Sequence, residues 1–538
     1  MIVLLKFLIV PIALFTGSTA FAQITMKEQA EIIARKQLGL SDDSRLLLDA
    51  SKDNFFVFNA ERDGWAVVSK HSPQGHVLAF SDKGRFVSED IPWIIESWLT
   101  RCCKNTEESI DDRMEIEPLV LTEWGQHEPY NLLVQQAGNS NGSNILLTGC
   151  GITAAAQVMK YHKWPAEVTH SIGQYPDSLP ETAFDWDGMQ NTYLPNDSSS
   201  SAFEVAKLMK YLGKGFEATY FKNGTSAFPE VIMKGLVEHF GYSHSINLLG
   251  VPYFPARNWN FQYLFKEMDK AIYHNLSEGI PVMIENDVER RGQHLFVADG
   301  YKRGGYFHFN WGWDGRYNGY YKFPIDTIPF EDRPTKEMCF AAIVDIKPSA
   351  ENERKRLLFV DLYSDIQECF RPSSNDDFLI PDVELWYIKN NYHLFDIGIG
   401  LYKGDELLDV FDAGNSEIEN FPLFSDYREI DLKFGSLIDD GSYRLVCMSK
   451  IHNTTEWVPA SGGYRDLIVI IEGNHLRCFS QESYDAYLSS VKDTVLPKYQ
   501  NNNRYYNLKG QQIDIRQHKG RMYIDNGKLK YLSNSSFP

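Results

Sequence analysis

The pattern of apolar and polar positions changes twice along the chain, and these changes predict three folded units. From residue 24 to about 105, an amphipathic helix pattern precedes short strand patterns and a second helix pattern. From about 118 to 348, helix patterns come first and strand patterns follow. From about 355 to 485, only short apolar runs separated by turn residues remain, which is typical of a β-sandwich. We therefore predict an α+β unit, a second mixed unit and an all-β domain.

Apolar spacing gives the individual elements of these units. The helices predicted in the first unit are Met26–Leu38 and Pro92–Cys102, and its strands are Phe55–Phe58, Trp65–Val68 and His76–Phe80. The helices predicted in the second unit are Cys150–His162, Ala202–Leu212, Pro229–Phe240 and Leu264–Asn275. The strands predicted in the β region include Leu357–Leu362, Phe395–Tyr402 and Leu467–Ile471.

The segments outside these units have distinct compositions. Residues 1–22 carry one Lys, an apolar run and a small-residue ending, which predicts a secretory signal peptide cleaved before Gln23. The polar, acid-rich run Lys104–Glu117 suits an exposed, cleavable linker, although an ordinary solvated loop explains it about as well. After the polar stretch Pro497–Arg504, a last hairpin-like segment follows, in which Tyr505–Gln512 precedes Gly520–Ile524.

Composition narrows the classes of function. The 538 residues are 43% hydrophobic, which is enough for packed cores, and the net charge of −19 argues against a nucleic-acid-binding protein. No stretch after the signal is apolar for long enough to span a bilayer. Seven cysteines are few and odd in number for an exported chain, and one disulfide is possible among Cys369, Cys447 and Cys478. Only Cys150 and Cys339 lie between residues 118 and 348, so we expect Cys150 to be free.

The predicted helix Cys150–His162 carries the first chemical signal. Thr148 is a suitable N-cap, and Pro165 marks the stop. A thiol in the first turn meets free N–H groups and the positive end of the helix dipole, which favour the nucleophilic thiolate. A lone cysteine at a helix start is nevertheless more often a buried packing residue, so this helix alone does not decide the function.

Two further segments supply the groups that a cysteine nucleophile needs. Gln126 can donate its amide to an oxyanion, together with the backbone N–H of Cys150. His294 begins a strand, as a rigidly held general base requires, and a turn at Lys302–Gly305 returns the chain antiparallel to it. That return brings Asn310 close enough to fix the imidazole tautomer.

Other residues near these segments have competing roles. Trp311 and Trp313 can shield the imidazole from water. His308 is at least as suited to a structural role in its strand, and Asp299 to capping a turn. The pairs His71/His76 and His239/His244 have spacings found in zinc sites, but no Cys-x-x-Cys accompanies them, so we predict no metal site.

Together these motifs resemble the streptopain family of papain-like cysteine peptidases over residues 24–348. The matching segments are Gly125–Gln126, Pro129–Asn131, Thr148–Cys150, Ala156–His162, Gly292–Gly300 and Asn310–Trp313. The resemblance implies an α+β architecture: signal peptide (1–22), inhibitory prodomain and linker (23–117), papain-like catalytic domain (118–348), β-sandwich-like region (349–495) and C-terminal hairpin segment (496–538).

The resemblance also implies the site residues and the reaction. Cys150 matches the nucleophile, His294 the general base and Gln126 the oxyanion-hole side chain, while Asn310 and Trp311 match the motif beside the histidine. Which of these two orients the ring stays open, because the order Asn-Trp-Gly-Trp differs from that of papain. The implied reaction is hydrolysis of peptide bonds by acyl transfer without a cofactor, with the prodomain blocking the cleft until it is removed.

The C-terminal third lies outside this resemblance. Its last segment is similar to terminal segments of exported Bacteroidetes proteins, which suggests secretion or surface attachment, while a plain stabilising β-module is the simpler explanation. The predicted function is that of a secreted, surface-bound or periplasmic cysteine endopeptidase acting on protein or peptide substrates. Two alternatives remain: a Cys-His amide transferase of the same fold, and a catalytically silent protein that binds surfaces through its β-sandwich.

Overall fold

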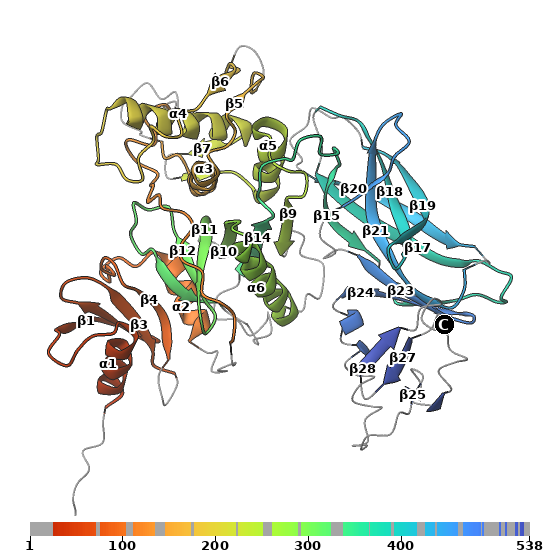
Figure 1. The fold of residues 1–538 in the computed structure, drawn as a ribbon, viewed down its shortest axis with the longest axis horizontal. Helices are drawn as coiled ribbons and strands as arrows, with labels where there is room; N and C mark the ends of the chain where they lie inside the picture. The colour runs from red at the N-terminus through yellow and green to blue at the C-terminus, as the bar shows by residue number, and fades with distance from the viewer. Residues whose placement is uncertain are drawn as a thin grey trace, which may run out of the picture.

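The computed structural model describes most of the chain between Thr25 and Tyr531. The described residues are 25–71, 76–103, 111–134, 146–173, 177–221, 224–250, 261–288, 292–323, 337–364, 366–388, 392–416, 425–435, 438–460 and 466–481, with shorter pieces from 483 to 531. The N-terminal unit lies against the strands of the central unit, and the β-sandwich lies on the opposite side, beyond α5, α6 and β9 (Figure 1). The fold is mixed α+β, as predicted.

One antiparallel sheet of ten strands runs through the first two units, in the order β1-β2-β3-β4-β13-β12-β11-β10-β14-β9. Its strands are β1 (Leu46–Ser51), β2 (Phe55–Ala60), β3 (Trp65–Ser69), β4 (Val77–Ser81), β9 (Asn247–Gly250), β10 (Val282–Val288), β11 (Gly292–Lys302), β12 (Tyr306–Asn310), β13 (Gly319–Lys322) and β14 (Glu337–Val344). The two units join where β4 pairs with β13, through Phe80 opposite Tyr320 and Ala79 opposite Tyr321.

The helices follow the apolar periodicity of the sequence closely. They are α1 (Met26–Gln37), α2 (Trp93–Cys102), α3 (Cys150–His162), α4 (Ser200–Gly215), α5 (Pro229–Phe240) and α6 (Phe261–Ser277). The short hairpins β5 (Glu167–Val168)–β6 (Thr182–Ala183) and β7 (Thr219–Phe221)–β8 (Gly224–Ser226) stand apart from the main sheet. The predicted bounds of α3 and α5 match those observed, because Pro165 follows the first helix and Gly241 ends the second.

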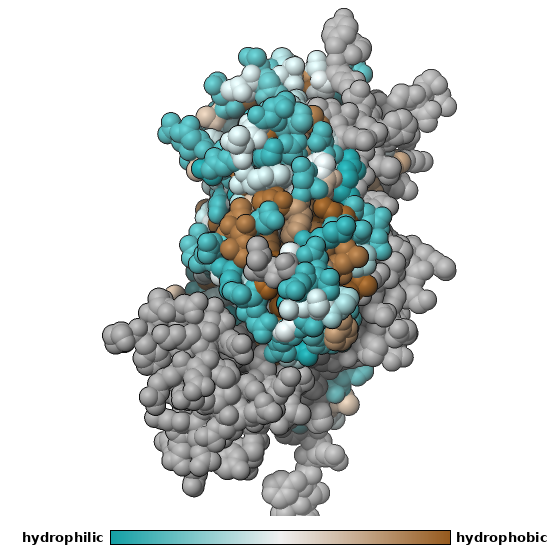
Figure 2. Space-filling view, turned by 90° about the vertical axis from the view of Figure 1, so that its right-hand side faces the viewer, coloured by the Kyte–Doolittle hydropathy of each residue, from teal (hydrophilic) through white to brown (hydrophobic). Residues whose placement is uncertain are grey.

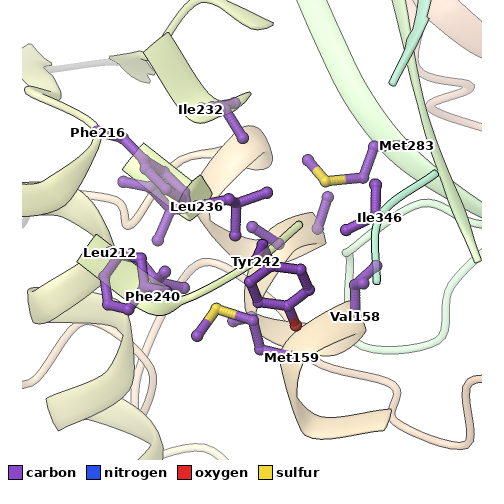
Figure 3. Packing of buried hydrophobic residues seen from close by; sticks show 14 of the residues in the cluster. Val158, Met159, Leu212, Phe216, Ile232, Leu236, Phe240, Tyr242, Met283 and Ile346 are labelled. Carbon is purple, nitrogen blue, oxygen red and sulfur yellow. The ribbon is translucent and has the colours of Figure 1, made fainter. Parts of the chain in front are cut away.

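A hydrophobic core holds α3 between the other helices and the sheet. Met159 of α3 lies near Phe240 of α5 and Tyr242, while Val158 lies beside Ile346, on the same side of the cluster as Met283 of β10 (Figure 3). All of these side chains are less than 10% exposed. Burying such a continuous apolar face fixes the helix, and with it the position of its first residue, relative to the sheet.

The C-terminal domain is a sandwich of two antiparallel sheets around a separate core. One sheet contains β15 (Leu358–Tyr363), β17 (Phe378–Ile388) and β20 (Ser425–Phe434). The other contains β16 (Glu368–Phe370), β18 (Phe395–Lys403), β19 (Glu406–Asn415), β21 (Gly441–Ile451), β22 (Val458–Pro459), β23 (Leu467–Glu472) and β24 (His475–Ser480). On the face of the molecule that forms the right-hand side of Figure 1, apolar residues gather in the middle and hydrophilic residues border them (Figure 2).

Two predictions about the C-terminal third need correction. Cys369, Cys447 and Cys478 are free thiols, so the suggested disulfide among them is absent. The last segment is more than a hairpin: β25 (Tyr505–Tyr506), β26 (Gln512–Ile513), β27 (Met522–Asp525) and β28 (Lys528–Tyr531) form a four-stranded sheet. Two-residue strands leave almost no apolar periodicity, which is why the pattern revealed only part of this sheet.

The acid-rich segment after α2 is also different from the prediction, since its second half is anchored. Asp111 accepts hydrogen bonds from the Tyr301 hydroxyl and from the N–H groups of Gly304 and Gly305. Arg113 donates to Asp269 at 2.8 Å and lies 4.4 Å from the centre of the Tyr301 ring. Residues 111–117, which we call the strap, therefore belong to the central unit rather than to an exposed linker.

The strap is held by charge as well as by geometry. Burial raises the pKa of Asp111, but hydrogen bonds from Tyr301, Arg113 and Gly304 outweigh it and hold the pKa well below its usual range. A carboxyl group with a depressed folded-state pKa stabilises the fold above its unfolded pKa. This contribution is lost only in strongly acidic solution, as the pH falls through the lowered value.

Among the residues that the structure describes, no helix is long and apolar enough to cross a membrane. Within the same residues, no three His, Cys, Asp or Glu side chains come together as metal ligands would.

Helix α2 attaches the N-terminal unit to the central sheet through Trp98. The indole is fully buried among Phe296, Phe309, Phe323 and Phe340, and its N–H donates to the carbonyl of Lys322 at 2.9 Å.

We predict that Trp98→Ala destabilises the full-length protein by about 3–5 kcal/mol, because it empties a large buried volume at this junction. Denaturant unfolding followed by fluorescence measures the loss. Phe203→Ala, which changes a side chain that is 49% exposed, is the control and costs less than about 0.5 kcal/mol. Equal stability of the two variants would contradict the assignment of Trp98 as the main anchor.

Candidate active site

Cys150 is the first residue of α3, and the backbone before it has a shape that glycine alone adopts easily. Gly149 has φ +100°, and a Cβ there would lie 2.7 Å from Cβ of Thr225. The predicted N-cap was wrong: Gly149 occupies that position, and the Thr148 hydroxyl instead bonds that of Thr153 at 3.0 Å. No side chain therefore caps the first turn of the helix.

Helix α3 packs on β11 and brings the cysteine beside the histidine strand. A Cβ on Gly151, the residue after Cys150, would lie 3.7 Å from Cδ2 of Leu295, the residue that follows His294. Both Cys150 and Leu295 also contact the core that holds α3. Two motifs separated by more than 140 residues in the sequence thus lie side by side.

The His294 ring is held by the next strand of the sheet. As predicted, β11 and β12 pair antiparallel around the Lys302–Gly305 turn. Nε2 of His294 lies 3.0 Å from the carbonyl oxygen of Trp311, and because a carbonyl only accepts, Nε2 carries the proton. The ring also stacks on Trp313, with 4.4 Å between centroids. This leaves the lone pair of Nδ1 available as a base.

Burial dominates the electrostatics of this pair in the full-length chain. Burial raises the pKa of the Cys150 thiol, against the lowering effect of the Leu295 and Gly151 N–H groups, and the charge of Glu285 raises it further. Burial lowers the pKa of His294 to about 4, although the bond to the Trp311 carbonyl opposes this shift. Both groups are therefore neutral at neutral pH.

Gln126 lies next to the start of α3. Its backbone carbonyl accepts a hydrogen bond of 3.1 Å from the N–H of Thr148, two residues before Cys150. Its side chain is partly exposed. The predicted oxyanion donor and the predicted nucleophile thus come from segments that are bonded directly to each other.

Asn310, predicted to lie near the ring, is directed elsewhere. Its amide donates to the carbonyl of Thr122 at 2.6 Å and to Oε1 of Gln157 at 3.0 Å. Its oxygen accepts from Gln157 and from the N–H of Gly312. The contact with His294 comes instead from the backbone of the neighbouring residue, Trp311.

His308 and Asp299 form a pair away from the cysteine. Nδ1 of His308 lies 2.6 Å from Asp299, whose other carboxylate oxygen accepts the N–H of Val120 at 2.9 Å. They join the strand pair to the segment that follows the strap, which is a structural role.

Sequence reasoning assigned no role to Gln157 or Glu285. Gln157 is fully buried. Its position inside the apolar stretch of α3 is the sequence signal that indicates a buried, hydrogen-bonded side chain. Glu285 lies opposite Leu295 in the β10–β11 pair and is 1% exposed. A lone Glu in a strand pattern carries no signal of such burial.

We predict that in the unprocessed protein Cys150 reacts with iodoacetamide more slowly at pH 7 than a free thiol does. Its raised pKa leaves little thiolate, so the rate should increase with pH well into the alkaline range. Peptide mass spectrometry measures the rate at Cys150, over times at which intact mass shows no released fragment. A rate that is already maximal at pH 6–7 would indicate a preformed thiolate–imidazolium pair and contradict this account.

Comparisons with known proteins agree with this geometry. Residues 124–321 match the model of the peptidase C10 family, and residues 14–106 match that of the Spi protease inhibitor. Streptopain from Streptococcus pyogenes is 27% identical over 307 residues, which are 51% of this chain and 75% of that protein. The thiol protease/hemagglutinin PrtT of Porphyromonas gingivalis is 27% identical over 298 residues, which are 49% of this chain and 33% of that protein.

Among solved structures, a fragment of Prevotella intermedia prointerpain A aligns with a TM-score of 0.47 and 24% identity, covering 57% of this chain and all of the fragment.

The central unit of this chain therefore matches the peptidase C10, or streptopain, family, a match to an inhibitor domain precedes it, and the protein is a cysteine peptidase made as a zymogen.

Proposed function

We propose that the protein is a secreted endopeptidase in which Cys150 is the nucleophile, His294 the general base and Gln126 the oxyanion donor. The observation that carries the proposal is the packing of Gly151, the residue after Cys150, against Leu295, the residue after His294, whose imidazole is held by the Trp311 carbonyl. A nucleophile, a base and a group that orients the base are the parts that acyl transfer requires.

The reaction follows from these positions. The Cys150 proton passes to His294, and the sulfur attacks the carbonyl carbon of a peptide bond. Gln126 and the backbone N–H of Cys150 stabilise the oxyanion of the tetrahedral intermediate. His294 then protonates the leaving amine, which departs to leave a thioester. Water, deprotonated by His294, hydrolyses the thioester and restores the thiol.

The N-terminal unit reaches the histidine side of this site through a chain of aromatic residues. The hydroxyl of Tyr317 donates to the carbonyls of Val87 and Asp90, at 2.9 and 3.1 Å. The Tyr317 ring meets Trp313 edge-on, and Trp313 stacks on His294. Removal of the N-terminal unit is therefore proposed to change the surroundings of Tyr317 and Trp313, and through Trp313 those of His294.

Maturation is proposed to cut the chain before Asp111, after the end of α2. The strap is bonded to the turn that follows the histidine strand, so a cut within or after it would detach a part of the central unit. The sequence between Cys103 and Asp111 is polar, as a cleavable segment requires.

Export through residues 1–22, which lie outside the described residues, and attachment through the last segment remain proposals from the sequence. So does the choice of peptides over other amides as substrates. The silent-binding alternative is disfavoured because Cys150, His294 and Gln126 are all present.

Incubation of the full-length protein beside Cys150→Ala, followed by intact mass, tests the proposal. We expect that only the wild type loses an N-terminal fragment, that the product begins between residues 104 and 111, and that it then hydrolyses casein. A chain starting at Asp111 should resemble this product, whereas one starting at Pro118 should be less stable because it lacks the strap.

Two results would contradict the proposal. One is equal processing of the wild type and Cys150→Ala with no added protease. The other is a stable product, starting before Asp111, that leaves casein and a peptide library intact.

A further inference from the structure

The side-chain amides of Gln157 and Asn310 form a buried pair in which each amide donates a hydrogen bond to the other. Nδ2 of Asn310 donates to Oε1 of Gln157 at 3.0 Å, and Nε2 of Gln157 donates to Oδ1 of Asn310 at 3.2 Å. Both residues are at most 1% exposed. A fully bonded amide pair in such a setting is rigid, because breaking it leaves buried polar atoms without hydrogen-bond partners.

On one side, this pair fixes the segment that leads to Gln126. Oε1 of Gln157 accepts the hydroxyl of Thr122 at 3.0 Å and the N–H of Trp124 at 3.1 Å. Nδ2 of Asn310 donates to the carbonyl of Thr122. The backbone just before the proposed oxyanion donor is thus bonded to α3, about two helical turns after Cys150.

On the other side, the pair fixes the carbonyl that holds His294. Asn310 precedes Trp311, and its Oδ1 also accepts the N–H of Gly312 at 3.1 Å, so one side chain secures both ends of the Trp311 residue. The N–H of Trp311 donates to Asn318 at 3.0 Å, which leaves its carbonyl directed at Nε2 of His294.

We propose that the Gln157–Asn310 amide pair is a positioning device that sets the cysteine helix, the oxyanion segment and the imidazole-orienting carbonyl relative to one another. The inference rests on the proposed function. Neither amide is proposed to touch substrate, so both act through residues that do. Loss of the pair should therefore reduce kcat, since misplacing reacting groups by about 1 Å can cost about 100-fold, while KM changes little.

Gln157→Met tests the proposal, because methionine keeps the length of the side chain and removes all its hydrogen bonds. Val158→Ala is the matched control: it removes buried volume from the next residue of α3, which lies beside Ile346 in the apolar core (Figure 3). Full-length proteins are processed, in trans where needed by tagged wild-type enzyme that is then removed, and assayed on a fluorogenic peptide with thermal unfolding in parallel.

For Gln157→Met we expect kcat to fall about 10- to 100-fold with KM within about threefold. The acid limb of the pH profile, where His294 becomes protonated and can no longer act as a base, should move to lower pH, because a loosened carbonyl no longer favours the protonated imidazole. Val158→Ala should lose stability but keep kcat and the pH profile. Unchanged kcat in Gln157→Met, or an equal fall in both variants, would overturn the proposal.

Gln157→Glu covers the case in which Gln157→Met does not fold. A carboxylate keeps the acceptor for Thr122, Trp124 and Asn310 but loses the donor to Asn310, so a smaller fall in kcat with the same pH shift is expected. Wild-type kinetics in this variant would overturn the proposal. Failure of the proposed function itself would be distinct, since wild type and Val158→Ala would then be inactive as well.

Discussion

The packing of α3 on the β11–β12 strand pair is the constraint on which the rest of the site depends. The helix supplies the cysteine, β11 the histidine, and the turn after β12 the carbonyl that fixes the ring tautomer. A buried apolar face on α3 and a network of paired amides at its middle hold these elements together. Hydrophobic burial stabilises the packing of α3 on the sheet, while the amide hydrogen bonds fix the position of α3 relative to Asn310 and to the segment at Thr122 and Trp124.

The same sheet also carries the attachment between the N-terminal unit and the central unit. The N-terminal unit extends it by pairing at β4–β13, but this pairing is short, and most of the attachment comes from Trp98 and the aromatic side chains around it. The strap is bonded separately, through Arg113 to Asp269 and through Asp111 to Tyr301.

Much of this could be predicted from the sequence, because strong periodicity and stop signals define α3, α5 and the long strands. The sequence predicts Cys150, His294 and Gln126 as site residues because each is a residue type suited to its proposed role in a recognisable local setting. Charge composition predicts a linker at the strap, because it does not reveal that Asp111 is surrounded by donors. The sequence leaves the role of Trp311 open, because a backbone carbonyl has no side-chain signature. It gives no role to Gln157, because the hydrogen-bond partners of Gln157 are distant in the sequence.

The most direct test of the central claim is labelling of the processed enzyme with a thiol-reactive peptide epoxide, followed by peptide mass mapping. The account predicts one adduct per molecule, on Cys150 alone, formed in step with the loss of peptidase activity and greatly slowed in His294→Ala. Peptidase activity that survives complete labelling of Cys150, or an inactivating adduct on another residue, would contradict it.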